Sequence, residues 1–271
     1  MIKDILILAE NLARQAGQYA RSQLGLAQTE YKLGHQIVTA VDRRCQALII
    51  EGVRREFSGH GFIAEEPSDP KAELFKDPPL GAEDTWWILD PLDGTRNFAN
   101  GVPQFAISIG VLRQGMPIVG VIYDPSTDRM YTGSLETPAR CNGKEIHAQG
   151  AALHDDSQIA IPSHYRDGTP LFIDEFLKHY ICQSLGSAAL HYAYVAQGSF
   201  AACVSRDVRL WDIAGGAAIT QAAGCLITDL EGQEIFPFNC AGYQGEPLPV
   251  LFAPPQIHTP LLDIIRFSIP Y

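Results

Sequence analysis

A short apolar strand, Trp87–Leu89, runs directly into a turn that carries two acidic side chains. The turn has the sequence Asp-Pro-Leu-Asp-Gly-Thr over residues 90–95. Pro91 fixes its own φ angle and Gly94 permits a conformation that other residues avoid, so the two acids cannot move as freely as in a flexible loop. Such a turn directs two carboxylates and a backbone carbonyl toward one point, and the fold has to build a polar site there.

The oxygen atoms of this turn suit Mg²⁺, which takes oxygen ligands at about 2.0–2.1 Å in an octahedral array. Thr95 adds a hydroxyl beside Asp90 and Asp93. A further carboxylate ligand could come from an acid at a helix start elsewhere in the chain, and Asp212 is the natural candidate. Taken singly, Asp212 and Asp42 could be helix N-caps. The two acids of the turn could likewise be ordinary turn residues.

Composition and charge exclude several classes of function. The chain of 271 residues carries 20 Lys and Arg against 31 Asp and Glu, a formal net charge of -11. Nucleic acids and anionic membranes require a basic protein face, so this balance argues against non-specific binding to either. The same excess suits a protein that binds hard cations. A hydrophobic fraction of 46% supplies enough core for one large domain or two closely packed ones.

The sequence contains no pattern typical of a membrane or secreted protein. No apolar run approaches the roughly 20 residues that span a bilayer. The N-terminal residues carry an acid early and are typical of an amphipathic helix, so we expect no signal peptide. The six cysteines lie far apart with no C-x-x-C pair. We therefore expect buried, reduced thiols and a cytoplasmic protein.

Apolar periodicity predicts helices and strands along the chain. Residues 2–24 follow helical spacing, Asp42 opens a second helix that runs to Phe57, and the proline-containing stretch 68–84 indicates an exposed excursion. Short strands of an antiparallel meander are expected at 87–89, 105–112, 118–123 and 129–132. Beyond them we expect strands at 159–161, 180–182, 200–204, 225–228 and 249–253, with helices at 187–196, 212–223 and 260–266.

The first half of the chain is expected to contain an antiparallel meander, whereas strands alternate with helices in the second half. This difference predicts two domains. Residues 1–140 would form an α+β domain that carries most of the metal ligands, and residues 141–271 an α/β domain that supplies Asp212 and the substrate-side pocket. The adjacent Trp86 and Trp87 could belong to an interface, although tryptophan in a strand is more often part of a core.

Several segments together resemble a known family. Residues 64–66, 87–98 and 211–216 are similar to the three signatures of the inositol monophosphatase family, the lithium-sensitive, Mg²⁺-dependent phosphatases. The resemblance extends over residues 38–42, 103–110, 120–125, 141–143 and 186–189, and so covers nearly the whole chain. It implies a layered αβαβα sandwich of the sugar phosphatase type, with an antiparallel sheet in the first half and a mixed sheet with helices in the second.

The resemblance also implies two metal sites. Glu65, Asp90 and the backbone carbonyl of Leu92 would hold the first Mg²⁺, and Asp90, Asp93 and Asp212 the second. A pair of metals roughly 3.5–4 Å apart can lower the pKa of a bound water and stabilise the displaced oxygen, which phosphomonoester hydrolysis requires. A third, weaker metal would lie near the loop that begins at Lys32, which matches the family by position only. His35 in that loop is more simply interpreted as a solvated side chain.

Catalytic and substrate-binding residues follow from the same resemblance. Thr95 would orient the attacking water, Asp42 would accept a hydrogen bond from the Thr95 hydroxyl, and Glu65 would take part in catalysis. Backbone N–H groups of Gly94 and Thr95 would face the phosphate. Further contacts to the substrate are implied for Gly186, Ser187, Ala188, Ser205 and Arg209.

One position departs from the pattern of the inositol-handling members. They usually carry an acid about seven residues before the aspartate of the Trp-Asp signature, and Ser205 stands there in this chain. Nearby Arg206 and Arg209 could favour a second anionic group on the substrate, or they could be ordinary loop charges.

The sequence thus predicts a Mg²⁺-dependent phosphomonoesterase acting on a small phosphorylated metabolite. Inositol-1-phosphate is the default substrate, and histidinol phosphate, fructose-1,6-bisphosphate and 3'-phosphoadenosine 5'-phosphate are alternatives. A regulatory, protein-binding role on the same scaffold is the alternative of another class. The family resemblance also favours a homodimer.

Overall fold

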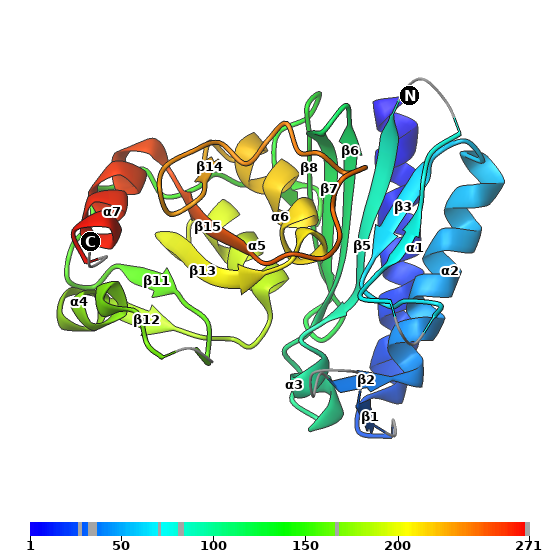
Figure 1. The fold of residues 1–271 in the computed structure, drawn as a ribbon, viewed down its shortest axis with the longest axis horizontal. Helices are drawn as coiled ribbons and strands as arrows, with labels where there is room; N and C mark the ends of the chain where they lie inside the picture. The colour runs from blue at the N-terminus through cyan, green and yellow to red at the C-terminus, as the bar shows by residue number, and fades with distance from the viewer. Residues whose placement is uncertain (27–28, 32–36, 70–71, 81–83, 166–167, 269–271) are drawn as a thin grey trace.

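The computed structural model describes residues 1–26, 29–31, 37–69, 72–80, 84–165 and 168–268. Secondary-structure elements in these ranges form five layers, seen edge-on in Figure 1. Helices α1 (Ile2–Gln23) and α2 (Ala40–Glu56) form one outer layer, and α4 (Leu171–His179) and α7 (Pro255–Phe267) form the other. Between them lie a large sheet, the helix pair α5 (Ala188–Ala196) and α6 (Leu210–Ala222), and a smaller sheet. The predicted αβαβα sandwich is confirmed.

The large sheet has eight strands in the order β10-β9-β8-β7-β6-β5-β3-β4. Its neighbours are antiparallel except for β3 and β5, which run parallel. The central strands are buried on both faces because helices cover each side. The strands are β3 (Gly61–Ala64), β4 (Phe75–Asp77), β5 (Thr85–Asp93), β6 (Ala106–Arg113), β7 (Met116–Asp124), β8 (Arg129–Ser134), β9 (Arg140–Cys141) and β10 (Lys144–Glu145).

The smaller sheet is mixed, as expected for the second half. Its order is β12-β11-β13-β15-β14, with β11 parallel to both β12 and β13, and β15 antiparallel to β13 and β14. The strands are β11 (Gln158–Ala160), β12 (Ile181–Gln183), β13 (Ala202–Val208), β14 (Leu226–Thr228) and β15 (Leu248–Ala253). A separate two-stranded sheet pairs β1 (Thr29–Tyr31) with β2 (Ile37–Thr39).

The large sheet ends at Glu145 and the smaller one begins at Gln158. The division of the chain into domains 1–140 and 141–271 remains a prediction. In the part of the chain that the structure describes, no helix is both long and apolar enough to cross a bilayer. All six cysteines are free, as predicted, but Cys141 and Cys182 are only half-buried rather than buried. Both Trp86 and Trp87 lie in the core.

The structure corrects several expected elements. Residues 171–179 form α4, which the sequence patterns leave unassigned, and α7 begins at Pro255 rather than at 260. Neither of the two helix-start aspartates is an N-cap. Thr39 caps α2 and Arg209 caps α6, whereas Asp42 and Asp212 occupy the third helical position and accept hydrogen bonds from the N-cap N–H groups. This is the carboxylate half of a capping box.

Helix α6 lies against the large sheet at backbone contact distance. A Cβ atom added at Gly110 of β6 would lie only 2.5 Å from the backbone carbon of Ala214, and one at Gly215 only 2.5 Å from the Ser108 hydroxyl. Gly120 of β7 likewise faces the backbone of Gly215. Glycines on both surfaces therefore let the helix approach the sheet, and this close packing fixes the position of the helix start.

We predict that Gly110→Ala lowers the free energy of unfolding by about 1–3 kcal/mol, because the added methyl group overpacks a contact between backbone atoms. Urea denaturation measures the change. The matched control is Gly59→Ala, because a Cβ at Gly59 meets nothing within 4 Å. Equal stability of the two variants would contradict the close approach of α6 to the sheet.

Candidate metal and active site

Strand β5 ends in the turn that carries Asp90 and Asp93. The pairing of β5 with β6 is interrupted between these two residues, and the Asp90 carboxylate accepts a hydrogen bond from the N–H of Leu92 at 3.0 Å. Gly94 follows with φ of 90°, and a Cβ there would lie 2.9 Å from the carbonyl oxygen of Gln104. The turn therefore requires glycine, and helix α3 (Thr95–Ala99) starts directly after it.

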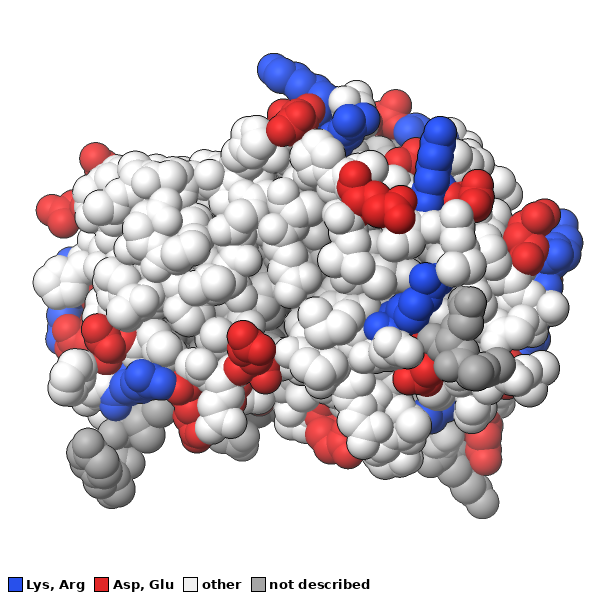
Figure 2. All heavy atoms as spheres, turned by 90° about the horizontal axis from the view of Figure 1, so that it is seen from above, with Lys and Arg blue, Asp and Glu red and all other residues white. Residues whose placement is uncertain are grey.

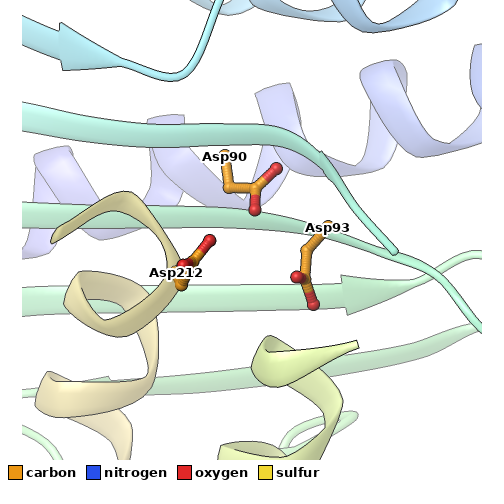
Figure 3. A group of neighbouring side chains, drawn as sticks. All are labelled: Asp90, Asp93 and Asp212. Carbon is orange, nitrogen blue, oxygen red and sulfur yellow. The ribbon is translucent and has the colours of Figure 1, made fainter. Parts of the chain in front are cut away.

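The start of α6 brings a third carboxylate to this turn. Figure 3 shows Asp212 on α6 directed toward Asp90 and Asp93 on β5. One carboxylate oxygen from each residue lies within 4.8 Å of the other two. All three come from elements whose positions are set by packing of the buried sheet and helix, so the cluster is a fixed feature of the fold.

Backbone and hydroxyl donors hold one oxygen of each acid. Besides the contact from Leu92 to Asp90, the N–H of Arg209 donates to Asp212 Oδ2 at 2.6 Å, and the N–H of Ala189 donates to Asp93 Oδ2 at 2.8 Å. The Ser187 hydroxyl also donates to Asp93 Oδ2. Each carboxylate is thereby oriented through one oxygen.

Burial makes these negative charges costly. It raises the pKa of Asp90 well above the usual 3.8, and the charges of Glu65, Asp93 and Asp212 raise it further. Burial followed by the charge of Asp93 likewise raises the pKa of Asp212. No ion pair among the described residues involves Asp90, Asp93 or Asp212. A buried group of like charges with a common centre is relieved by a cation, and an all-oxygen donor set fits Mg²⁺.

Glu65 and Leu92 lie where they could complete such a site. Glu65 follows β3, is half-buried, and donates its backbone N–H to the carbonyl of Leu89 at 3.2 Å. Its charge is close enough to raise the pKa of both Asp90 and Asp212. The carbonyl oxygen of Leu92 lies 2.9 Å from the Thr95 hydroxyl.

The Thr95 hydroxyl also contacts a buried acid. It lies 3.0 Å from Oδ1 of Asp42, whose side chain is fully buried. Oδ2 of Asp42 accepts from the Thr39 N–H at 2.8 Å and from the Thr39 hydroxyl at 2.6 Å. Burial raises the pKa of Asp42, while these hydrogen bonds oppose the increase. The structure thus brings Thr95 and Asp42 together.

A cavity of about 240 Å³ opens beside Asp93 and Asp212. Of the residues expected to bind substrate, Gly186, Ser187, Ala188 and Ser205 line it. Gly94, Thr95 and Arg209 are not among the described residues that form its wall.

Arg206 and Arg209 are not lining residues of the cavity, although the backbone N–H of Arg209 contacts Asp212. The charge of Arg209 acts on Tyr243 and that of Arg206 on Tyr165, and neither arginine lines the cavity. A contact between Arg209 and the substrate remains a prediction. Lys32 and His35 lie outside the described residues.

Several lining residues are not expected from the sequence. His191 accepts a hydrogen bond from the Leu185 N–H through Nε2 at 2.9 Å, and burial lowers its pKa to about 4, so it is neutral near pH 7. Tyr192, His164, Ser163 and Ser184 also line the cavity. The helix at 187–196 is apolar nearly all round, and no periodicity in it distinguishes a cavity residue from a core residue.

Comparisons with known proteins agree with the layered fold. Residues 1–262 match the model of the inositol monophosphatase family. The chain belongs to the inositol monophosphatase family. Members of this family are phosphoric monoester hydrolases, and the chain is an enzyme of that class.

Individual relatives cover most of the chain. It is 32% identical to an inositol-1-monophosphatase of Rhizobium meliloti, over 86% of this chain and 85% of the relative. It is 31% identical to the Nus factor SuhB of Vibrio cholerae, over 84% and 86%. The crystal structure of the extragenic suppressor protein suhB from Bartonella henselae superposes with a TM-score of 0.87 at 25% identity, over 98% of this chain and 100% of that one.

We predict opposite effects of Asp212→Asn with and without metal. Removing one of three like charges raises the free energy of unfolding of the metal-free protein at pH 7, because burial and the charge of Asp93 disfavour the Asp212 carboxylate. Wild-type protein gains about 2.7 kcal/mol when Mg²⁺ is present at 100 times its Kd, and the variant loses most of this gain. Denaturation with and without Mg²⁺ measures both.

The control for this experiment is Asp207→Asn, an exposed aspartate on β13. It should change neither value.

The raised pKa values of Asp90 and Asp212 have a further consequence. The folded metal-free protein binds protons at these two carboxylates more tightly than the unfolded chain does. Its stability should therefore fall as the pH rises above about 4. A Mg²⁺ response that is the same in Asp212→Asn and wild type would contradict the metal assignment.

Proposed function

We propose that this chain is a Mg²⁺-dependent phosphomonoesterase for a small phosphorylated metabolite, with inositol-1-phosphate as the default substrate. The observation that carries the proposal is the convergence of Asp90, Asp93 and Asp212 beside a cavity of about 240 Å³. Hydrolysis of phosphoric monoesters is the reaction of the family, and family members depend on Mg²⁺.

Two ions account for the donor set. Glu65, Asp90 and the Leu92 carbonyl would hold one, and Asp90, Asp93 and Asp212 the other. When bound, Mg²⁺ supplies a more acidic water at neutral pH and stabilises negative charge on phosphate and leaving oxygens. A third, weaker ion near Lys32 remains a prediction.

Thr95 can hold the attacking water. Its single hydroxyl proton can be directed to the carboxylate of Asp42, which leaves an oxygen lone pair to accept a hydrogen bond from water. Asp42 is itself fixed by Thr39, so its Oδ1 is held beside the Thr95 hydroxyl as an acceptor before substrate binds. Glu65, whose charge acts on Asp90, would assist removal of a proton from this water.

The phosphate would lie against the turn at Gly94 and Thr95, whose N–H groups begin α3. The alcohol part of the substrate would enter the cavity lined by Gly186, Ala188 and Ser205. No Lys or Arg is among the described residues that line this cavity. This favours a monophosphate with an uncharged alcohol part over fructose-1,6-bisphosphate or 3'-phosphoadenosine 5'-phosphate, with histidinol phosphate as a further alternative.

A regulatory role is the second candidate, because one relative is named a Nus factor. Such a role would act through protein contacts, and we propose it only beside catalysis, since the acidic cluster is complete. On the face shown in Figure 2, acidic and basic side chains are interspersed and form no continuous basic surface. We further propose a cytoplasmic homodimer that binds neither nucleic acid nor membrane.

Phosphate release from a panel of substrates tests the proposed function. The panel contains inositol-1-phosphate, histidinol phosphate, fructose-1,6-bisphosphate and 3'-phosphoadenosine 5'-phosphate. We expect turnover only with Mg²⁺, fastest on inositol-1-phosphate, and inhibition by Li⁺ in the millimolar range. Loss of a residue that hydrogen-bonds a metal ligand lowers activity by up to about 100-fold. Asp93 would bind the metal directly, so Asp93→Asn should lower kcat by more than about 100-fold.

Asp174→Asn is the control for Asp93→Asn, because Asp174 is an exposed aspartate on α4. It should retain wild-type kcat. Near-normal kcat of Asp93→Asn at saturating Mg²⁺ would refute the two-metal assignment. A wild-type protein that releases no phosphate from any member of the panel would refute the phosphatase function itself.

A further inference from the structure

Tyr192 is a buried residue that lines the cavity. It lies on α5, its side chain is fully buried, and it lines the cavity together with Asp93 and Asp212. Burial, Cys203 and the charges of Asp212 and Asp93 raise the pKa of this phenol. A phenol is protonated at neutral pH even without such an increase, and it can therefore donate a hydrogen bond.

This hydroxyl has no hydrogen-bond partner among the described residues. Two other buried tyrosines do have partners: Tyr131 donates to the side-chain oxygen of Gln197 at 3.1 Å, and Tyr243 donates to the carbonyl of Glu246 at 3.0 Å. A buried hydroxyl without a partner is destabilising, so its presence in a residue that lines a cavity requires a reason.

The packing of the ring fixes where the hydroxyl points. The ring stacks on Phe252 of β15, with centroids 4.2 Å apart and an interplanar angle of 29°. On α6, a Cβ atom at Gly216 would lie 2.6 Å from Cβ of Tyr192, so the helix leaves room for the tyrosine and for nothing more. The hydroxyl is therefore held in place before any ligand binds, which lowers the entropy cost of using it.

The place of Tyr192 in the cavity indicates which part of the substrate it would meet. The phosphate is proposed to lie at the turn after β5, whereas Tyr192 belongs to the wall that α5 shares with β13. Ser205 of β13 contributes another hydroxyl to this wall, and Ser184 and Ser163 also line the cavity. A wall of neutral hydrogen-bonding groups is complementary to an alcohol that carries hydroxyls.

We propose that the Tyr192 hydroxyl donates a hydrogen bond to a hydroxyl oxygen on the alcohol part of the substrate and thereby selects phosphomonoesters of polyols. The inference rests on the proposed phosphatase function and adds to it the residue that selects the substrate class. Substrates without hydroxyls on the alcohol part leave Tyr192 without a partner and gain nothing from it.

Tyr192→Phe tests this directly, with inositol-1-phosphate and phenyl phosphate as the two substrates. The variant should lower kcat/KM for inositol-1-phosphate by about 10-fold, the effect of one hydrogen bond to a neutral group, and change that for phenyl phosphate by less than about 2-fold. The Tm of the variant should equal or exceed that of wild type, because an unpartnered buried hydroxyl is removed.

The matched control is Tyr194→Phe, because Tyr194 lies on the same helix but is not among the cavity residues. It should leave the ratio of the two kcat/KM values unchanged. If Tyr192→Phe leaves the ratio of the two kcat/KM values unchanged, the inference is overturned. This holds whether or not both values fall and whether or not the Tm is lower. Complete absence of phosphatase activity in the wild type would instead refute the proposed function, and with it this inference.

Discussion

The close approach of α6 to the large sheet is the constraint on which the site depends. Gly110 of β6 and Gly215 of α6 carry no side chain, so the backbone of the helix approaches the strand closely. Because the helix starts at Leu210 against the end of β5, its third residue, Asp212, reaches the turn that holds Asp90 and Asp93. A stripe of small residues in the core thus sets the geometry of a charged cluster at its edge.

The cluster itself is held against its own repulsion. Main-chain N–H groups of Leu92, Ala189 and Arg209 each bind one oxygen of an aspartate, so the carboxylates cannot turn apart. Burial and mutual charge raise the pKa values of Asp90 and Asp212 as a result. Repulsion among the carboxylates therefore destabilises the metal-free fold, and a bound divalent cation would offset this loss of stability. In the proposed function the same cation would activate the attacking water.

The acidic set can be predicted from the sequence because its chemistry is local. Asp90-Pro91 and Asp93-Gly94 combine acids with residues that restrict or permit backbone conformations, and this combination by itself indicates a cation site. The roles of Asp42 and Asp212 in their helices are predicted less well, since a cap and a third position differ by a few residues at a helix end. Tyr192 is not predicted, because an aromatic side chain in an apolar helix usually belongs to a core, and only the folded arrangement shows that it lines the cavity.

Anomalous diffraction from crystals grown with Mn²⁺ in place of Mg²⁺ is the sharpest test of the two-metal site, because Mn²⁺ accepts the same oxygen ligands and can be located by its own signal. We expect two peaks roughly 3.5–4 Å apart. Asp90 should contact both, Asp93 and Asp212 one, and Glu65 with the Leu92 carbonyl the other. The absence of any peak between the three aspartates at saturating Mn²⁺ would show that this cluster is not a metal site.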